Sequence, residues 1–292
     1  MKNTLIIILN LLIIFIAVKT SAVNSQVTEA WVRNYNHLGS QDVGNAIAID
    51  NSGNVFVAGS INNSSATFID YGTLKYNSSG TQQWFRLYNG SINWFDYADD
   101  IAVDAAGNIY VTGRTDASSG NATCVTIKYN TSGDSLWVRR YVNAYCTRML
   151  LDSLSNVYVV GRKGDAAFCD YFIIKYNSAG DSLWSRTYSS PGSYPDEATC
   201  AAVDNAGNVY ISGYTFTQTP GPHSGITTIK YNSSGTLQWT AVFDYPATGS
   251  HKANDIAVDN AGNVYVGGYS DTAGLGRTFL VLKYNSAGTK LW

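Results

Sequence analysis

The sequence I-A-V-D-A-A-G-N-I-Y-V-T-G at residues 101–113, followed by T-I-K-Y-N-T-S-G-D-S-L-W at residues 126–137, decides the fold. Nearly the same sequence occurs five times, at intervals of 47 to 55 residues. A period near fifty indicates an array of repeated units rather than a single irregular domain. The turn aspartates are Asp50, Asp104, Asp152, Asp204 and Asp259; the lysines are Lys75, Lys128, Lys175, Lys230 and Lys283; the tryptophans are Trp31, Trp84, Trp137, Trp184, Trp239 and Trp292.

Each unit contains four short strand signals separated by turn residues. In the second unit we expect strands at 101–104, 108–113, 126–130 and 135–141, because apolar residues alternate there with a period of two. Gly107 supplies the positive φ for the first turn, and Asp104 accepts its amide bonds. Four-stranded antiparallel units of this length are typical of propeller blades, so we predict an all-β propeller with five repeats present.

The composition supports β-structure and excludes one class of partner. Charged residues make up only 14%, while the chain has 21 Tyr, 27 Gly and 2 Met. The net charge of -2 and the lack of a basic stripe give no field for phosphates, so no nucleic-acid partner is expected.

The N-terminus has the three parts of a secretory signal peptide: Lys2, an apolar run at 5–18, and Thr-Ser-Ala at 20–22. The run is shorter than the ~20 residues that cross a bilayer, so no membrane span is expected. We therefore predict a secreted or cell-surface protein. The boundaries are a signal peptide at 1–22, a short linker at 23–30 and a propeller at 31–292, with a closing strand at about 31–42 and blade units at about 43–88, 97–141, 144–188, 197–243 and 252–292.

Segments at both ends of the array are candidates for the same outer strand, the one that would close the ring. The segment W-V-R-N-Y at 31–35 is an outer strand without inner strands before it, and the fifth unit begins its own outer strand at Thr289. Since a propeller closes with a single such strand, we expect a truncated ring with further units and neighbouring domains beyond Trp292. The alternative is a five-bladed ring with one copy displaced.

The repeat I-A-V-D-x-x-G-N-V-Y-V-x-G, with T-I-K-Y-N-x-x-G-x-x-x-W after it, resembles the seven-bladed β-propeller repeat (SBBP) family of secreted bacterial proteins. The resemblance covers 31–292 and implies seven blades, of which about two are missing. It implies a secreted or surface module but no particular chemistry. The third unit departs from the pattern at 152–156, D-S-L-S-N, which lacks the turn glycine, so we expect a distorted blade there.

The four cysteines of an exported chain are candidates for two disulfides. Cys146 and Cys169 begin strands at the same end of the third unit, so we expect them to pair; free buried thiols are the alternative. Cys124 and Cys200 are the others. The spacings do not favour zinc, and no metal site is expected.

Function is expected where the units differ, in the long connections that share one end of the blades. Aromatic side chains in these connections are candidates for stacking against sugar rings or a partner's side chains, although ordinary loop packing explains each of them singly. They are Trp94, Phe95, Tyr97, Tyr194, Phe216 and Tyr245.

A second candidate site is the mouth of the central channel. Four residues before the turn aspartate, Asp100, Arg148 and Asp255 occupy equivalent places on the innermost strands. An ion pair between Asp100 and Arg148 is the structural alternative to a binding role.

Three functions compete. A non-catalytic binding or adhesion scaffold, taking a glycan or a protein on the loop face, is the first. A propeller enzyme, quinoprotein-like or glycan-active, with its site at the channel mouth is the second, but neither a vicinal Cys-Cys pair nor a Ser-His-Asp arrangement is present, and no catalytic residue or cofactor is expected. A structural spacer in a larger surface protein is the third.

Overall fold

A computed structural model describes residues 29–37, 41–63, 68–90, 95–116, 122–165, 167–191, 194–217, 223–244, 249–272 and 276–292. The chain divides at Val32, and the fold described below is that of the unit Arg33–Trp292. Among the described residues, none forms a helix with the length and apolar character that crossing a bilayer requires.

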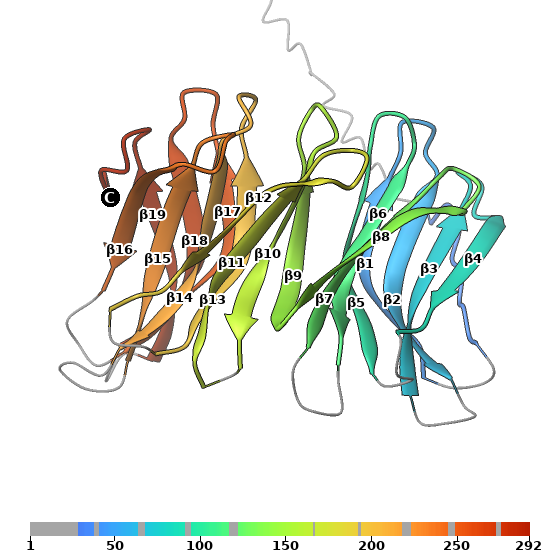
Figure 1. The fold of residues 1–292 in the computed structure, drawn as a ribbon, viewed down its shortest axis with the longest axis horizontal. Coiled ribbons are helices and arrows are strands. Elements are labelled where there is room, and N and C mark those ends of the chain that lie inside the picture. The colour runs from blue at the N-terminus through green and yellow to red at the C-terminus, as the bar shows by residue number, and fades with distance from the viewer. Residues whose placement is uncertain are drawn as a thin grey trace, which may run out of the picture. The chain divides into compact units, whose positions relative to one another are not determined.

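The strands follow one another as up-and-down sheets, called blades 1 to 5 here (Figure 1). Blade 1 has β1 (Val43–Ile49), β2 (Val55–Asn63), β3 (Phe68–Tyr76) and β4 (Gln82–Tyr88). Blade 2 has β5 (Asp96–Val103), β6 (Ile109–Thr115), β7 (Thr123–Tyr129) and β8 (Ser135–Val142). Blade 3 has β9 (Ala144–Leu151), β10 (Val157–Gly164), β11 (Cys169–Tyr176) and β12 (Ser182–Tyr188). Blade 4 has β13 (Asp196–Val203), β14 (Val209–Thr217), β15 (His223–Tyr231) and β16 (Leu237–Phe243). Blade 5 has β17 (Ser250–Val258), β18 (Val264–Thr272) and β19 (Gly276–Tyr284).

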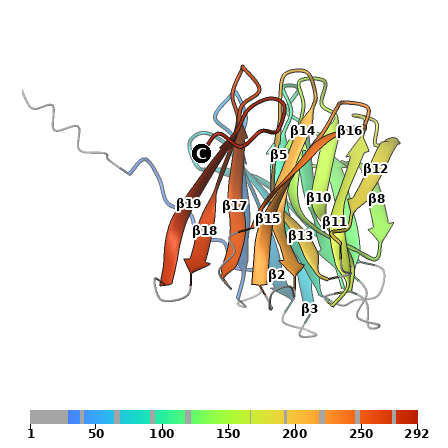
Figure 2. The ribbon, with the colours of Figure 1, turned by 90° about the vertical axis from the view of Figure 1, so that its left-hand side faces the viewer.

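Every blade is antiparallel and keeps its strands in chain order, as the alternating pattern predicts. The first strands of successive blades pack beside one another, from β1 through β5, β9 and β13 to β17, and so form the inner layer. Blade 5 begins a fourth strand at Lys290, which bridges Tyr284. Figure 2 shows its three full strands side by side.

Both hairpin turns of a blade lie at the same end, here called the turn end. In the first hairpin of blade 2, the Asp104 carboxylate accepts the amides of Ala106 and Asn108 at 3.0 and 2.8 Å, and Gly107 has φ 82°. The long connections lie at the opposite end, called the loop end, because each strand reverses direction. This division follows the expectation from the turn residues.

The turn of blade 3 keeps its geometry without a glycine. Ser155 takes φ 59° and its amide binds the Asp152 carbonyl at 2.9 Å, as the glycines do in the other blades. The turn therefore keeps the hydrogen bond of the other blades, but it does so with a serine in the left-handed region in place of glycine. Such a conformation is strained for a residue with a Cβ atom.

At the turn end, a repeated Trp joins the blades at all four junctions, and a repeated Lys and Arg do so at the first three; blade 4 has Ala241 in the place of the Arg. Trp137 donates its indole N–H to the Ser178 carbonyl at 3.2 Å, and Lys128 donates to the same oxygen at 2.9 Å. Arg139 donates from Nε to the Gly180 carbonyl at 2.5 Å. Lys128 thus binds a backbone carbonyl of the next blade, and in blade 3 Lys175 does the same while also lying 3.7 Å from the Asp152 carboxylate of its own blade.

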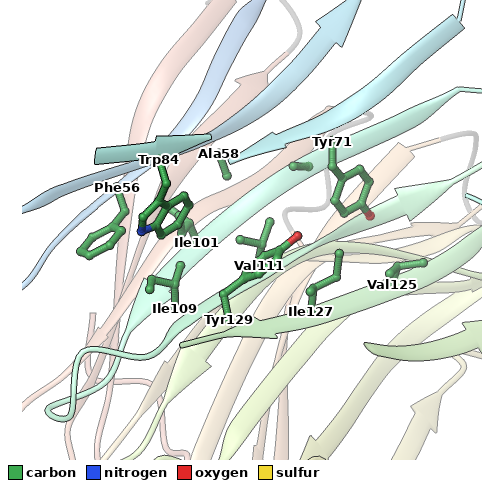
Figure 3. Packing of buried hydrophobic residues seen from close by; sticks show 11 residues of the cluster. Phe56, Ala58, Tyr71, Trp84, Ile101, Ile109, Val111, Val125, Ile127 and Tyr129 are labelled. Carbon is green, nitrogen blue, oxygen red and sulfur yellow. The ribbon is translucent and has the colours of Figure 1, made fainter. Parts of the chain in front are cut away.

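Apolar clusters fill the spaces between blades. In the first of them, Phe56 and Trp84 of blade 1 face Ile109 and Val111 of blade 2 (Figure 3). The rings of Phe56 and Trp84 lie 6.2 Å apart. Since each cluster draws on two blades, a blade buries its faces only against its neighbours, as repeat arrays do.

Candidate functional site

Each inner strand has a β-bulge near the loop end, where one residue is left out of the ladder. In blade 2 the pairing moves from Ala98–Gly113 to Asp100–Thr112, and Asp99 is the extra residue. The same shift occurs in all five blades. The bulged residues are Asn45, Asp99, Thr147, Thr199 and Asn254.

A recurrent glycine on the second strand makes the bulge possible. A Cβ atom on Gly113 would lie 1.9 Å from the Tyr97 carbonyl oxygen, and one on Gly213 would lie 1.9 Å from that of Glu197. No side chain fits at such a distance, so the bulge requires glycine there.

The bulged residues line a cavity of about 570 Å³ at the loop end, called the axial cavity here. It belongs to the inner strands of all five blades, because each contributes its bulged residue. Charged side chains complete its wall. The full lining is Asn45, Asp99, Thr147, Arg148, Glu197, Thr199, Lys252 and Asn254.

Several bulged side chains also tie their blade to the next. Asn45 donates to the Ala98 carbonyl at 2.8 Å, and Thr199 donates to the Ala253 carbonyl at 2.6 Å. Thr147 makes the same bond to Ala198 at 3.3 Å. These bonds fix three positions of the cavity wall, since Asn45, Thr147 and Thr199 are each held by the next blade.

Two arginines behind the wall hold its carboxylates. Arg114 lies 3.5 Å from Asp99 and 4.3 Å from the centre of the Tyr97 ring. Arg162 lies 3.3 Å from Glu197 and stacks 4.3 Å from the Tyr145 ring. The guanidinium planes therefore cover the aromatic faces while neutralising the acids.

Burial changes the protonation of acids at the loop end. Desolvation raises the pKa of Asp99 to about 6, although Arg114 acts in the opposite direction. Desolvation likewise raises the pKa of Asp96 and of Asp196 to about 6, although Asp96 accepts the Gly90 amide and Asp196 accepts that of Ser190.

Of the three residues predicted at the channel mouth, Arg148 lines the axial cavity. Asp100 has a structural role instead. Its carboxylate accepts hydrogen bonds from the backbone amide of Ile101 at 2.9 Å and from that of Met149, in the next blade, at 2.8 Å. Asp255 accepts the amide of Ile256. The described ion pairs do not include one between Asp100 and Arg148.

The predicted aromatic residues form two separate groups rather than one platform. Phe95 stacks on Tyr97 with centroids 6.3 Å apart. Tyr194 meets Phe216 edge to face at 6.1 Å, and Phe216 lines a small pocket of about 150 Å³. Trp94 and Tyr245 lie outside the described residues.

The predicted disulfide between Cys146 and Cys169 is corrected by the structure. Cys146 is bonded to Cys124 of blade 2, with Cα atoms 5.3 Å apart, while Cys169 and Cys200 are free and buried. Cys146 and Cys169 stand on β9 and β11 with β10 between them, so their backbones are two strand spacings apart, roughly 10 Å, which no disulfide spans. The actual bond joins two blades.

In blades 2 and 5 the sequence prediction missed the axial cavity by one residue. A regular strand would place Asp100 and Asp255 in the channel, but the bulge shifts the register so that Asp99 and Asn254 line the cavity instead. The signal was the glycine within each second strand, because an isolated glycine in a strand marks a bulge or a close approach. Among the described residues, no cluster of side chains has the make-up of a metal site.

Comparison with known proteins agrees with this architecture. The profile of the family SBBP, beta-propeller repeat, matches residues 30–65, 83–121 and 247–276. The resemblance seen in the sequence is thereby confirmed in these three stretches. No curated protein matches the chain.

Several solved structures are similar to this chain at low sequence identity. The Dos1 propeller superposes with a TM-score of 0.53 at 8% identity, covering 88% of this chain and 72% of that one. The β-propeller domain of the Trilobed protease from Pyrococcus furiosus gives 0.49 at 7% identity, covering 84% and 68%. Sqt1 from Chaetomium thermophilum gives 0.45 at 10% identity, covering 86% and 71%. The likeness to the first shows the propeller fold alone.

Proposed function

We propose that the protein is a secreted or cell-surface propeller that acts as a non-catalytic binding scaffold and meets its glycan or protein ligand at the loop end. The observation that carries the proposal is the axial cavity. Its lining differs from blade to blade, whereas the turn end repeats the same tryptophan–carbonyl bond at each of the four junctions between the described blades. Repeated residues serve the scaffold, and the varied ones are left for recognition.

Export is supported by two features of the chain. The N-terminal segment has the composition of a signal peptide, and the bond between Cys124 and Cys146 belongs to an oxidising compartment.

Binding of the full chain to immobilised glycans and candidate surface proteins tests the scaffold function. Arg148→Gln in the cavity and Phe216→Ala in the small pocket should weaken binding at least fivefold, while Asn205→Ala at the turn end should leave it unchanged. The bound glycan should be recovered chemically intact by mass spectrometry. If no glycan or protein binds, or if Asn205→Ala is as harmful as the cavity variants, the spacer function stands instead.

We also propose that the five blades belong to a larger ring, of seven blades, with the missing ones between blade 5 and blade 1. Ile47 of β1 is 65% exposed, whereas its counterparts Ile101 and Ile256 are each 6% exposed because a preceding blade covers them. Phe279 of β19 is fully exposed, whereas its counterpart Tyr71 is 1% exposed beneath the following blade. Two apolar faces thus lack the neighbour that the other blades have.

The segment before blade 1 supports the same proposal. Arg33 donates from Nε to the Gly80 carbonyl at 2.7 Å, as Arg86 of an outer strand does to Gly133 of the next blade at 2.7 Å. Arg33 therefore occupies the place of an outer-strand arginine from a preceding blade, and blade 5 begins an outer strand of its own at Lys290.

Sequencing the locus beyond the codon for Trp292 tests the ring. Two further units before a stop codon are expected. If a stop codon follows directly and the chain is monomeric in solution, the proposal of a larger ring is wrong. The exposed apolar faces of blades 1 and 5 would then be stable without a neighbouring blade. If the chain self-associates through these exposed apolar faces, Phe279→Ser should reduce that self-association.

A further inference from the structure

The acids of the axial cavity are already satisfied by the fold. Asp99 is paired with Arg114 at 3.5 Å. Glu197 is paired with Arg162 at 3.3 Å and also accepts the Tyr214 hydroxyl at 3.3 Å. The carboxylates on the wall therefore have partners behind it, and a ligand need not neutralise them.

The cations of the cavity are different. Arg148 of β9 is exposed, and within the described part of the chain it makes neither a hydrogen bond nor an ion pair. Lys252 of β17 likewise has no described acid partner and lies 5.6 Å from the Tyr214 ring. A guanidinium and an ammonium group in one cavity, both without a bound carboxylate, are a site for an oxyanion.

Arg148 does act electrostatically on two acids of blade 2, since desolvation raises the pKa of Asp99 and of Asp100 and Arg148 acts on both in the lowering direction, but both carboxylates have closer partners. Asp100 follows the bulge of blade 2, and its two oxygens accept the amides of Ile101 and Met149. Asp255 accepts the amide of Ile256 and does not belong to the lining.

The neutral lining residues specify a second part of the ligand. Thr147 and Thr199 donate their hydroxyl hydrogens to the carbonyls of Ala198 and Ala253, so their remaining lone pairs can only accept. Asn254 makes no described side-chain bond and offers both a donor and an acceptor. A ligand with several hydroxyl groups would satisfy all three residues.

We propose that the axial cavity binds an acidic sugar, a hydroxyl-bearing carboxylate of mono- to disaccharide size, with its carboxylate held by Arg148 and Lys252 and its hydroxyls by Thr147, Thr199 and Asn254. A volume of about 570 Å³ suits a ligand of that size. Neutral sugars are disfavoured because Arg114 and Arg162 cover one face of the neighbouring tyrosines, which removes stacking surface. This inference deepens the proposed binding function and rests on it.

Titration calorimetry of the full chain with D-glucuronate, D-galacturonate, D-glucose and acetate tests the proposal. One or both uronates should bind at least tenfold more tightly than glucose, which lacks the carboxylate, and than acetate, which lacks the hydroxyls. Arg148→Gln should lower the affinity for uronate roughly tenfold, since a charge-assisted hydrogen bond contributes about 1.5–3 kcal/mol. Raising NaCl from 50 to 500 mM should weaken binding by the wild type but not by the Arg148→Gln, Lys252→Gln double variant.

Arg140→Gln is the matched control, because Arg140 stands on the outer strand β8 and binds the Tyr88 hydroxyl outside the cavity. It should leave uronate affinity unchanged. Thermal unfolding of each variant confirms that the fold is intact. Glucose binding as tight as glucuronate binding, or unchanged affinity in the double variant, would overturn the acidic-sugar proposal. A neutral glycan whose binding is lost in the cavity variants would overturn it while leaving the scaffold function standing, whereas the absence of all binding would remove both.

Discussion

Aspartates at the two ends of the blades have opposite protonation behaviour. At the turn end, desolvation raises the pKa of Asp104, but hydrogen bonds from the Asn108 side chain and amide and from the Tyr110 hydroxyl outweigh it, and the pKa is lowered. At the loop end, desolvation dominates and the pKa of Asp196 rises to about 6. The difference shows that the turn end is optimised for stability, while the loop end contains buried charge that the fold tolerates.

Removing a repeated contact at the turn end should have the largest effect. Trp137→Ala deletes a ring that is 9% exposed between blades 2 and 3, together with its bond to the Ser178 carbonyl. We expect a loss of about 3–5 kcal/mol in the free energy of unfolding, measured by urea denaturation. The exposed loop-end aromatic Phe168, replaced by alanine, should change stability by less than about 0.5 kcal/mol. Equal losses would show that the two ends are not distinct.

The disulfide should provide the next largest effect, and it lies at the loop end. Cys124→Ser combined with Cys146→Ser should lower the free energy of unfolding by about 3 kcal/mol, because the bond closes a loop with a sequence separation of 22. Reduction of the wild type with dithiothreitol should give the same loss. Dithiothreitol should not affect the double variant; a further decrease there would contradict the assignment.

The pH dependence of stability should separate the two ends. A raised pKa, as in Asp96 and Asp196, stabilises the fold below the unfolded value of 3.8, and this contribution is lost as the pH rises through about 6. A lowered pKa, as in Asp104 and Asp204, stabilises the fold above 3.8, and this contribution is lost as the pH falls through the folded value. Thermal unfolding should therefore show maximal stability near pH 4, with a decline as the pH rises towards 6 and another as it falls below 4.

Two variants assign the limbs of that profile. Asp196→Asn should flatten the decline above pH 5, and Asp204→Asn should reduce the decline below pH 4. A profile with its maximum above pH 7 would contradict the raised pKa values at the loop end.

The smallest effect is expected at the turn of blade 3, where Ser155 has φ 59°. Ser155→Gly should raise the free energy of unfolding by about 0.5–1 kcal/mol, since glycine adopts this conformation without a Cβ clash. The reverse change in blade 1, Gly53→Ser, should be destabilising by a similar amount or more, because Gly53 has φ 75° and a Cβ atom there would lie in tight contact, 3.3 Å from that of Ser78. Calorimetric melting of both variants checks the pair.

The fold was predictable because repetition removes ambiguity. The turn D-x-x-G-N fixes where two strands meet, and its recurrence fixes the length of a blade; the structure places the four strands of blade 2 at 96–103, 109–115, 123–129 and 135–142. The inner strand is longer than the sequence indicated, because its first residues, Asp96 to Asp100, do not alternate and include a bulge.

The candidate site was less predictable because the β-bulge interrupts the alternation of the inner strand. A residue such as Asp99 faces the cavity only because the ladder omits it, and alternation assigns the place to its neighbour Asp100. The pairing of Cys146 was also out of reach, since Cys124 lies in the preceding unit and meets it only after two blades have packed. Contacts between blades depend on their relative position, which a pattern within one blade does not contain.

The joint between blades has a consequence for how such proteins change over time. Trp, Lys and Arg of one blade all donate to backbone carbonyls of the next, as Trp84 and Lys75 do to Thr131 and Arg86 does to Gly133. A carbonyl oxygen is the same whatever residue carries it, so the recipient turn can vary except at its glycine; a Cβ atom on Gly133 would lie 2.9 Å from the Trp84 ring. A duplicated unit can therefore form the same hydrogen bonds with its new neighbours. Arrays of this kind gain, lose or exchange units by recombination without further changes in the residues between blades.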